Sequence, residues 1–207
     1  MRKQSLFIFI KRLNQPVFTT HQLSAISKKS PSTVIQGLRI LEREGLIVRI
    51  YRGIWAISER YISPYEIIPL LFPLSSTYLS FISALHLYGI IEQIPQQITL
   101  ASISHTRFIS TKVGMFSVHH ISPEFFCGFD WYKKEGKFLV AEPEKALIDC
   151  LYLSAYKKKQ FIHFPELHFP KGFSFRRAKE WIKRIPNPNI KKYVEKRLNI
   201  ILKKSRI

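Results

Sequence analysis

The stretch SPSTVIQGLRILEREGLIVRIYRGIW, residues 30–55, predicts a helix that leads directly into a short hairpin. Ser30 is a typical N-cap, and Pro31 suits the first helical position because its φ angle is already fixed. The helix is expected to run to Glu44 and to end at Gly45, since glycine readily takes the left-handed conformation that follows a helix.

A helical wheel gives this predicted helix two different faces. Val34, Leu38 and Leu41, with Ile35 beside them, form an apolar stripe that is expected to face a core. The opposite face is short, polar and cationic, and it consists of Ser32, Thr33, Gln36, Arg39 and Arg43. Such side chains can donate to phosphates and base edges, and Gln36 and Arg39 could make bidentate contacts to adenine and guanine in a major groove.

The segments LIVRI and IWAI are predicted to pair as a hairpin around YRG, where Gly53 takes the positive φ of a tight turn. This hairpin would expose three further residues beside the helix, namely Arg49, Tyr51 and Arg52. Side chains at the tip of such a wing reach the phosphate backbone or the neighbouring groove of DNA.

Two shorter helices are predicted upstream. Residues 5–13 form an apolar-rich first helix, and a cap at Thr19 or Thr20 begins a second helix that is expected to bury Leu23 and Ile26. Three helices followed by a hairpin make a winged helix-turn-helix. The first 62 residues are therefore expected to form a DNA-binding domain.

The chain has 207 residues and a formal net charge of +19, which is unevenly distributed. Residues 1–63 carry eleven Lys and Arg against three Glu, residues 64–156 carry six against eight acidic residues, and residues 157–207 carry sixteen against three. Two basic ends favour a polyanionic partner, above all nucleic acid, because neutralised phosphates release counterions. Solubility alone is the alternative explanation of this charge.

The composition changes near residues 63 and 64, and we expect a second, mixed α/β domain over residues 63–207. It is predicted to contain helices at about 65–72 and 77–89, the latter capped at Ser76 or Thr77. Three segments are predicted strands: QQITLASI, GMFSVHHI and KFLVAE, with KKEG as a turn before the last.

The remaining helices of the predicted second domain are basic or apolar. One is expected to run from Pro143 to about Leu153. From about residue 172, the segments SFRRAKEWIKRI, capped by Ser174, and NIKKYVEKRLNIILKK predict two basic amphipathic helices. The predicted fold class is therefore α+β, with an N-terminal winged helix-turn-helix.

The cysteines and histidines indicate no metal site and no cofactor. Cys127 and Cys150 are the only cysteines and have apolar or aromatic neighbours, as expected of buried thiols in a reducing compartment. His119 and His120 are adjacent on a strand-like segment, so they point to opposite faces and cannot easily bind one metal ion.

No signal peptide and no membrane span are expected. Lys11 and Arg12 interrupt the apolar N-terminal run, and prolines and a glycine break the stretch between residues 66 and 92, which has no charged residue. The sequence therefore predicts a cytoplasmic protein.

The acidic residues around the EPEK segment do not indicate an enzyme. Glu142 and Glu144 begin a predicted helix, where acidic side chains suit the positive helix terminus, and Asp149 follows Lys145 by four residues. The motif of a metal-dependent nuclease, an acidic residue followed by one further residue and then Lys, is not formed here, because Pro143 occupies a position that the motif needs. The sequence also has no glycine-rich phosphate loop and no GxSxG motif.

Three segments beyond the wing carry a family resemblance: TYLSFISALHLYGIIEQIPQQITLAS, FSVHHISPEFFCG and FLVAEPEKALIDCLYL. Together with the winged helix, they resemble the AbiEi family of antitoxins and transcriptional regulators from bacterial type IV toxin-antitoxin systems, over about residues 17–156. The signature of the partner toxin, a GS motif followed by paired Asp residues, is absent, as expected for an antitoxin.

The resemblance implies a winged helix that binds inverted repeats in the protein's own promoter and represses the operon. It also implies a second domain that counters a nucleotidyltransferase toxin without a stable complex. DNA contact is assigned only to residues already selected on the helix and wing, namely Ser32, Thr33, Gln36, Arg39, Arg43, Arg49, Tyr51 and Arg52. A homodimer on DNA would suit a palindromic operator.

Two alternatives follow from the same residues. In the first, the chain is a non-catalytic protein-interaction module whose winged helix does not read DNA.

The second concerns the basic C-terminal helices, which lie outside the resemblance. They could add non-specific DNA affinity, face the toxin or its RNA substrate, or simply present solvated charges.

Overall fold

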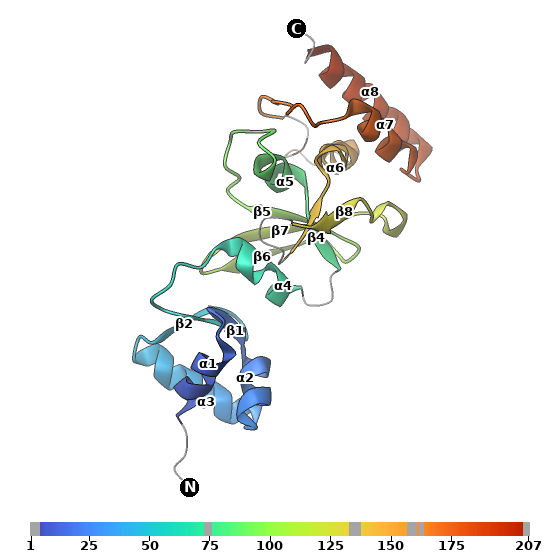
Figure 1. Ribbon diagram of the computed structural model, residues 1–207. Coiled ribbons are helices and arrows are strands. Elements are labelled where there is room, and N and C mark those ends of the chain that lie inside the picture. The colour runs from blue at the N-terminus through green and yellow to red at the C-terminus, as the bar shows by residue number, and fades with distance from the viewer. Residues whose placement is uncertain (1–4, 73–75, 133–137, 157–160, 162–163, 205–207) are drawn as a thin grey trace. The chain divides into compact units, whose positions relative to one another are not determined.

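The computed structural model describes residues 5–72, 76–132, 138–156, 161 and 164–204 (Figure 1). It has a mixed α+β fold, which confirms the predicted fold class. The chain divides into two compact units. The first comprises Met1–Pro73 and Ser110–Gly114, and the second comprises Leu74–Ile109 and Met115–Ile207.

The first unit contains the winged helix-turn-helix. Its helices are α1 (Leu6–Leu13), α2 (Thr20–Ser27) and α3 (Pro31–Arg43). Its antiparallel sheet has the order β1-β3-β2, formed by β1 (Val17–Thr19), β3 (Ile54–Ile57) and β2 (Ile47–Tyr51). The predicted helices and hairpin are confirmed, whereas β1 was not predicted. A 3-10 helix, η1 (Pro64–Ile67), and α4 (Ile68–Leu71) follow where the sequence predicts a helix.

Apolar side chains from all three helices and the sheet form the core of the winged helix. The buried members are Ile10, Phe18, Leu23, Val34, Leu38, Leu41, Ile47 and Trp55. Ile26 does not belong to this core and is 38 % exposed, so its predicted burial is wrong. Thr20 and Leu23 are the buried residues of α2, and Ile26 lies at the edge of the face that they define.

The second unit is built on a six-stranded sheet with the order β6-β7-β5-β4-β9-β8. The neighbours β4 and β9, and β5 and β7, are parallel, whereas β4 and β5, and β8 and β9, are antiparallel. In chain order the strands are β4 (Thr77–Leu79), β5 (Ile98–Ser102), β6 (Arg107–Thr111), β7 (Gly114–His120), β8 (Phe129–Trp131) and β9 (Leu139–Ala141).

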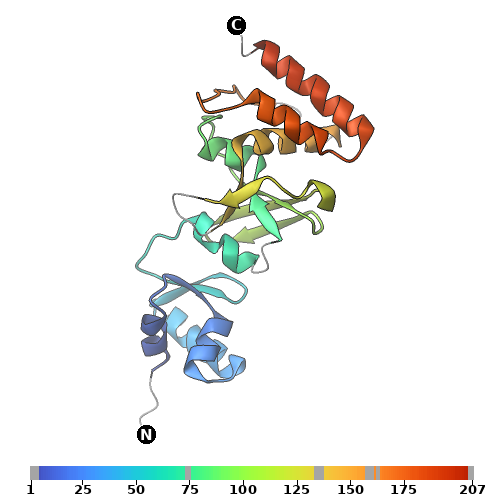
Figure 2. The same cartoon turned by 45° about the vertical axis from the view of Figure 1, so that its right-hand side comes forward.

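Four helices pack around this sheet, together with a short 3-10 helix, η2 (Pro123–Phe125). They are α5 (Phe81–Leu87), α6 (Pro143–Ala155), α7 (Phe175–Lys183) and α8 (Pro188–Lys204). Both views place α5 and α6 over one face of the sheet, with α7 and α8 on the outer side of α6 (Figure 1 and Figure 2). Because α6 lies between these layers, nearly all of its side chains are buried.

Several predictions for the second unit need correction. The helix predicted over 77–89 begins only at Phe81, because Thr77–Leu79 forms a central strand, so neither Ser76 nor Thr77 caps it. Strands β6 and β8 were not predicted. The predicted KKEG turn lies outside the described residues. The helices predicted from Pro143, and after the Ser174 cap, are confirmed.

Among the described helices, none combines the length and the apolar character needed to cross a lipid bilayer.

Candidate nucleic-acid interface

Helix α3 presents the polar face that the sequence predicts. The Ser30 hydroxyl accepts a hydrogen bond from the Thr33 backbone N–H at 3.3 Å, which fixes the start of the helix. Val34, Leu38 and Leu41 are buried in the core and so set the rotation of α3 about its axis. The residues on the opposite side, Ser32, Thr33, Gln36, Arg39 and Arg43, are all exposed.

The wing is a short, well-anchored hairpin. Gly53 has φ +77°, the left-handed conformation that its turn requires. Its carbonyl oxygen accepts a hydrogen bond from the Thr20 backbone N–H at 2.9 Å, so the wing turn is fixed to the start of α2. Arg49, Tyr51 and Arg52 of this hairpin are exposed.

Trp55 anchors the wing hairpin to the start of α2. Its ring is 3 % exposed, and its indole N–H donates to the Thr20 hydroxyl oxygen at 3.0 Å. The guanidinium of Arg49 lies 5.8 Å from the centre of the same ring. A cation over an aromatic face is attracted to it and loses side-chain freedom. Arg49 is therefore held on the surface in a restricted position.

Glu42 joins α3 to the wing strand. Its carboxylate accepts a hydrogen bond from the Arg49 backbone N–H at 3.2 Å. Helix α3 and the wing are thus linked by a direct contact as well as by the shared core. This arrangement lets a single rigid unit present both elements to one ligand.

A hollow of about 810 Å³ lies between the start of α2, helix α3 and the wing, and residues 69–71 also line it. Three arginines, Arg39, Arg49 and Arg52, contribute to its lining together with Tyr51, and Glu42 is the acidic residue among the lining side chains. The structure therefore brings four of the eight predicted residues to one hollow. The other four, Ser32, Thr33, Gln36 and Arg43, are exposed on α3 outside its lining.

His21 is a candidate contact residue that the sequence analysis missed. It is exposed in the first turn of α2 and lines the same hollow. The capping box formed by Thr19 and Gln22 places this turn, since each side chain bonds to the backbone N–H of the other residue. Only the packing of α2 against the wing brings His21 to the hollow that Arg52 also lines, and no local pattern predicts that packing.

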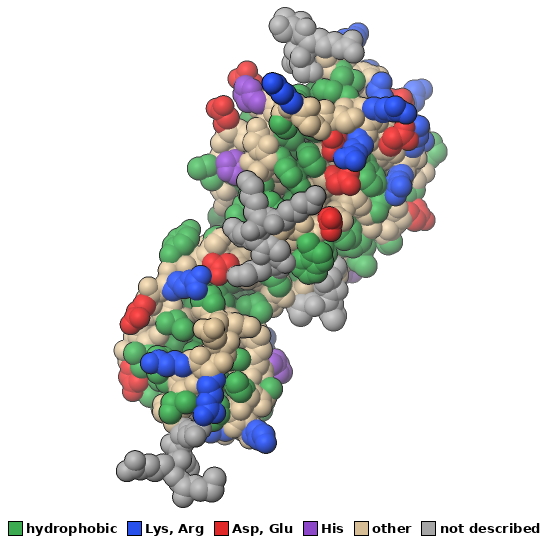
Figure 3. All heavy atoms as spheres, viewed as in Figure 1, with side chains coloured by type: hydrophobic (Ala, Val, Ile, Leu, Met, Phe, Trp, Pro, Cys, Tyr) green, Lys and Arg blue, Asp and Glu red, His purple; other side chains and the backbone are tan. Residues whose placement is uncertain are grey.

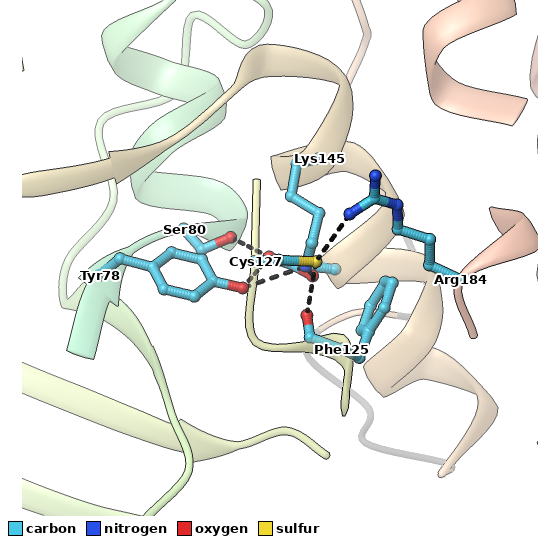
Figure 4. A network of polar contacts seen from close by, with 7 residues as sticks. Tyr78, Ser80, Phe125, Cys127, Lys145 and Arg184 are labelled. Atoms are coloured by element: carbon cyan, nitrogen blue, oxygen red, sulfur yellow. Dashed lines mark hydrogen bonds and ion pairs between the residues drawn. The ribbon is translucent and has the colours of Figure 1, made fainter. Parts of the chain in front are cut away.

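Of the acidic residues considered for catalysis, Glu144 and Asp149 are buried in the second unit, whereas Glu142 is half-buried. The residues that contact Asp149 are Tyr78, Ser80 and Lys145 (Figure 4). Asp149 and Lys145 are completely buried and form an ion pair. The Asp149 carboxylate also accepts hydrogen bonds from the Tyr78 hydroxyl at 3.0 Å and the Ser80 hydroxyl at 2.7 Å. The Lys145 ammonium also donates to the Tyr78 hydroxyl at 3.0 Å and lies 3.7 Å from the centre of the Phe125 ring.

Burial dominates the electrostatics of this buried network. It raises the pKa of Asp149 above its ordinary value, although the Lys145 ammonium and the hydrogen bonds from Ser80 and Tyr78 act to lower it. Burial and the nearby Asp149 carboxylate raise the pKa of Tyr78 well above 10. The network connects β4 to α6 inside the core.

Glu144 lies in the first turn of α6, as the sequence predicts, and is buried there. It is 1 % exposed, and its carboxylate accepts a hydrogen bond from the Ser174 backbone N–H at 2.8 Å. Its role is to fix the start of α7 on α6. Glu142 is the N-cap of α6, but its side chain makes no capping hydrogen bond.

The histidines are separated as the sequence predicts. His119 is buried and its Nε2 lies 2.9 Å from the Ser117 hydroxyl, whereas His120 is exposed. Within the described part of the chain, no three His, Cys, Asp or Glu side chains are grouped closely enough to hold a metal ion.

Comparison with known families agrees with this geometry. Residues 7–58, which extend from α1 to the end of β3, match the family described as "Transcriptional regulator, AbiEi antitoxin". That description names a regulator and an antitoxin and no catalytic activity. No protein of curated function matches the chain. The N-terminal winged helix, residues 7–58, is therefore similar to the AbiEi antitoxin family of transcriptional regulators, as the sequence resemblance indicates.

Proposed function

We propose that this protein is a DNA-binding autorepressor that also serves as the antitoxin against a nucleotidyltransferase toxin. The observation that supports DNA binding is the exposure of all eight predicted contact residues on α3 and the wing. The antitoxin role rests on the family match of residues 7–58 and on the resemblance of the second domain, which extends to about residue 156.

In this proposal, α3 enters the major groove of duplex DNA and reads base edges. Gln36 and Arg39 contact adenine and guanine, because their amide and guanidinium groups match the donor and acceptor patterns of those bases. Ser32, Thr33 and Arg43 contact the flanking phosphates. Contacts to phosphate position the protein, and contacts to base edges provide the sequence preference.

The wing supplies the second set of contacts. Arg49, Tyr51 and Arg52 reach the phosphate backbone or the neighbouring groove, next to the duplex segment that α3 occupies. Inverted repeats in the protein's own promoter would be bound by a homodimer in the cytoplasm, with half-sites separated by about one helical turn or a multiple of it. The toxin would be opposed without a stable complex.

A two-part cellular experiment tests this proposal. The protein is expressed beside a reporter driven by the DNA upstream of its own gene, and separately beside a gene for a nucleotidyltransferase toxin. We expect Arg39→Ala to abolish repression and to leave protection from the toxin intact. If Arg39→Ala and the unmodified protein repress equally, the winged helix does not read DNA, and the interaction-module alternative gains support.

Arg52→Ala is expected to weaken binding to every DNA sequence by a similar factor. A lysine or arginine that neutralises one phosphate contributes roughly 0.9 to the slope of log K against log salt concentration, so the slope should become shallower by about that amount. Fluorescence anisotropy over a salt series measures both quantities. Arg60→Ala is the matched control, because Arg60 is exposed but does not line the hollow. A loss confined to one DNA sequence would contradict a phosphate contact for Arg52.

A further inference from the structure

Helices α7 and α8, the C-terminal helical pair, carry a concentration of positive charge that is additional to the charge of the winged helix. Between residues 175 and 204 the chain has eleven Lys and Arg against two Glu. Figure 3 shows Lys and Arg side chains gathered over α7 and α8. This charge belongs to the second unit, whereas α3 and the wing belong to the first.

The apolar faces of both helices are already covered. Ala178 and Ile182 of α7, and Val194 and Leu198 of α8, are buried where the two helices pack on α6 and on each other. Among the described side chains of α7 and α8, the large hydrophobic residue that is exposed is Ile200, with 43 % of its surface accessible. Only the outer, charged faces are therefore available to a partner.

Helix α8 arranges part of this charge in a stripe. Lys192, Lys196 and Lys203 are exposed on one side of the helix and, with Asn199 and Glu195, border a shallow hollow of about 420 Å³. At a rise of about 1.5 Å per residue, the three lysines are separated by roughly 6 Å and 10 Å along the helix axis. Three ammonium groups at these intervals can each meet a different phosphate of a nucleic-acid backbone.

On α7, one of the two acidic residues of the pair is already neutralised. Glu180 is bound by the Lys183 ammonium at 2.7 Å and 3.0 Å, and this ion pair lowers the pKa of Glu180. Arg176, Arg177 and Lys179 remain exposed on the same helix. The acidic side chains therefore leave most of the positive charge of the helical pair available for a polyanion.

We propose that the outer face of α7 and α8 is a second, sequence-independent binding surface for the backbone of duplex DNA. Lysines act as point charges toward phosphates and are depleted at the cores of protein–protein interfaces, which disfavours a protein partner. Binding of a single strand would need exposed aromatic rings for stacking, whereas Phe175, Trp181 and Tyr193 are half-buried. Insertion into a membrane would need a free apolar face.

The choice of DNA over RNA rests on the proposed function, since the same chain would already hold a DNA duplex through its winged helix. Two binding surfaces on one chain raise the effective concentration of the duplex at each other. The C-terminal surface would therefore increase the affinity for any DNA sequence, while α3 and the wing would supply the preference for the operator.

A charge-neutralising triple variant of the full chain tests the second surface. K192Q/K196Q/K203Q removes the stripe, and K11Q/R12Q/R60Q is the control, because it removes the same charge from exposed positions outside both surfaces. Each protein is titrated over a salt series against upstream DNA, a scrambled DNA duplex of equal length and an RNA duplex of equal length. Circular dichroism first establishes that both variants are folded.

We expect the stripe variant to bind both DNA duplexes about tenfold more weakly at ~0.1 M salt, with a slope shallower by up to about 2.7. The ratio between upstream and scrambled DNA should not change, and the control variant should remain within about twofold of the unmodified protein. Equal losses in the two variants would overturn the proposal, as would a loss confined to RNA. Failure of the proposed function would give a different result, because the unmodified protein itself would then bind upstream and scrambled DNA equally.

Discussion

Asp149→Ala is expected to destabilise the folded chain by about 3–5 kcal/mol. The substitution leaves the Lys145 ammonium buried without its counter-ion and removes the acceptor of the Tyr78 and Ser80 hydroxyl groups. Domains are commonly stable by only about 5–15 kcal/mol, so a loss of this size would unfold an appreciable fraction of the protein at physiological temperature. Urea unfolding followed by far-ultraviolet circular dichroism measures the change.

Two comparison variants separate the ion pair from a general effect of losing a carboxylate. Asp130→Ala removes an exposed aspartate from β8 and should change the free energy of unfolding little. The double variant K145M/D149L replaces both buried charges by apolar side chains and should recover part of the loss, because no unpaired charge remains. A free energy of unfolding for Asp149→Ala within about 1 kcal/mol of the unmodified protein would contradict this account of the buried network.

The same network holds a strained backbone position. Phe81 has φ +57°, which is unusual for a residue with a side chain, and it begins α5 directly after Ser80. The Ser80 hydroxyl donates to Asp149, and its carbonyl oxygen accepts from the Thr99 hydroxyl at 2.8 Å. These contacts fix the turn from β4 into α5, so the loss of Asp149 would also weaken that turn.

The double substitution Q36A/R39A is expected to remove most of the preference for operator DNA. A bidentate contact to a base contributes about 1–3 kcal/mol of discrimination, so the two together should account for roughly 2–6 kcal/mol. Both side chains are exposed, and alanine favours helix formation, so the free energy of unfolding should hardly change. Competition between operator and scrambled DNA measures the preference directly.

The control for this variant is R12A/Q15A, which removes the same two residue types from exposed positions at the end of α1 and just beyond it. It should leave both the affinity and the preference unchanged. A Q36A/R39A protein that loses operator and scrambled binding by the same factor would show that these side chains contact phosphates and not bases.

Local signals explain why α3 and the wing could be predicted from the sequence. Ser30 and Pro31 determine where α3 begins, Gly45 allows the chain to leave it, and Gly53 forms the wing turn. Each of these residues acts on its immediate neighbours. The apolar and polar sides of α3 also followed from spacing alone, because Val34, Leu38 and Leu41 recur with the helical period.

Long-range contacts explain what the sequence analysis missed. The segment Thr77–Leu79 has only three residues within an apolar run, and it becomes a strand because β5 and β9 pair with it. A short apolar run does not distinguish a strand from a helix. The pair Lys145 and Asp149 has the spacing of a surface ion pair on a helix, and the packing of α5, α7 and α8 around α6 buries it.

The central claim is sequence-specific DNA binding through α3 and the wing, and one titration tests it most directly. The full chain is titrated over a salt series against DNA from upstream of its own gene, with a scrambled duplex of equal length as competitor. The account predicts a preference of ~10³ or more for the upstream DNA. Equal and steeply salt-dependent binding to both duplexes would contradict it, because charge alone would then explain the affinity.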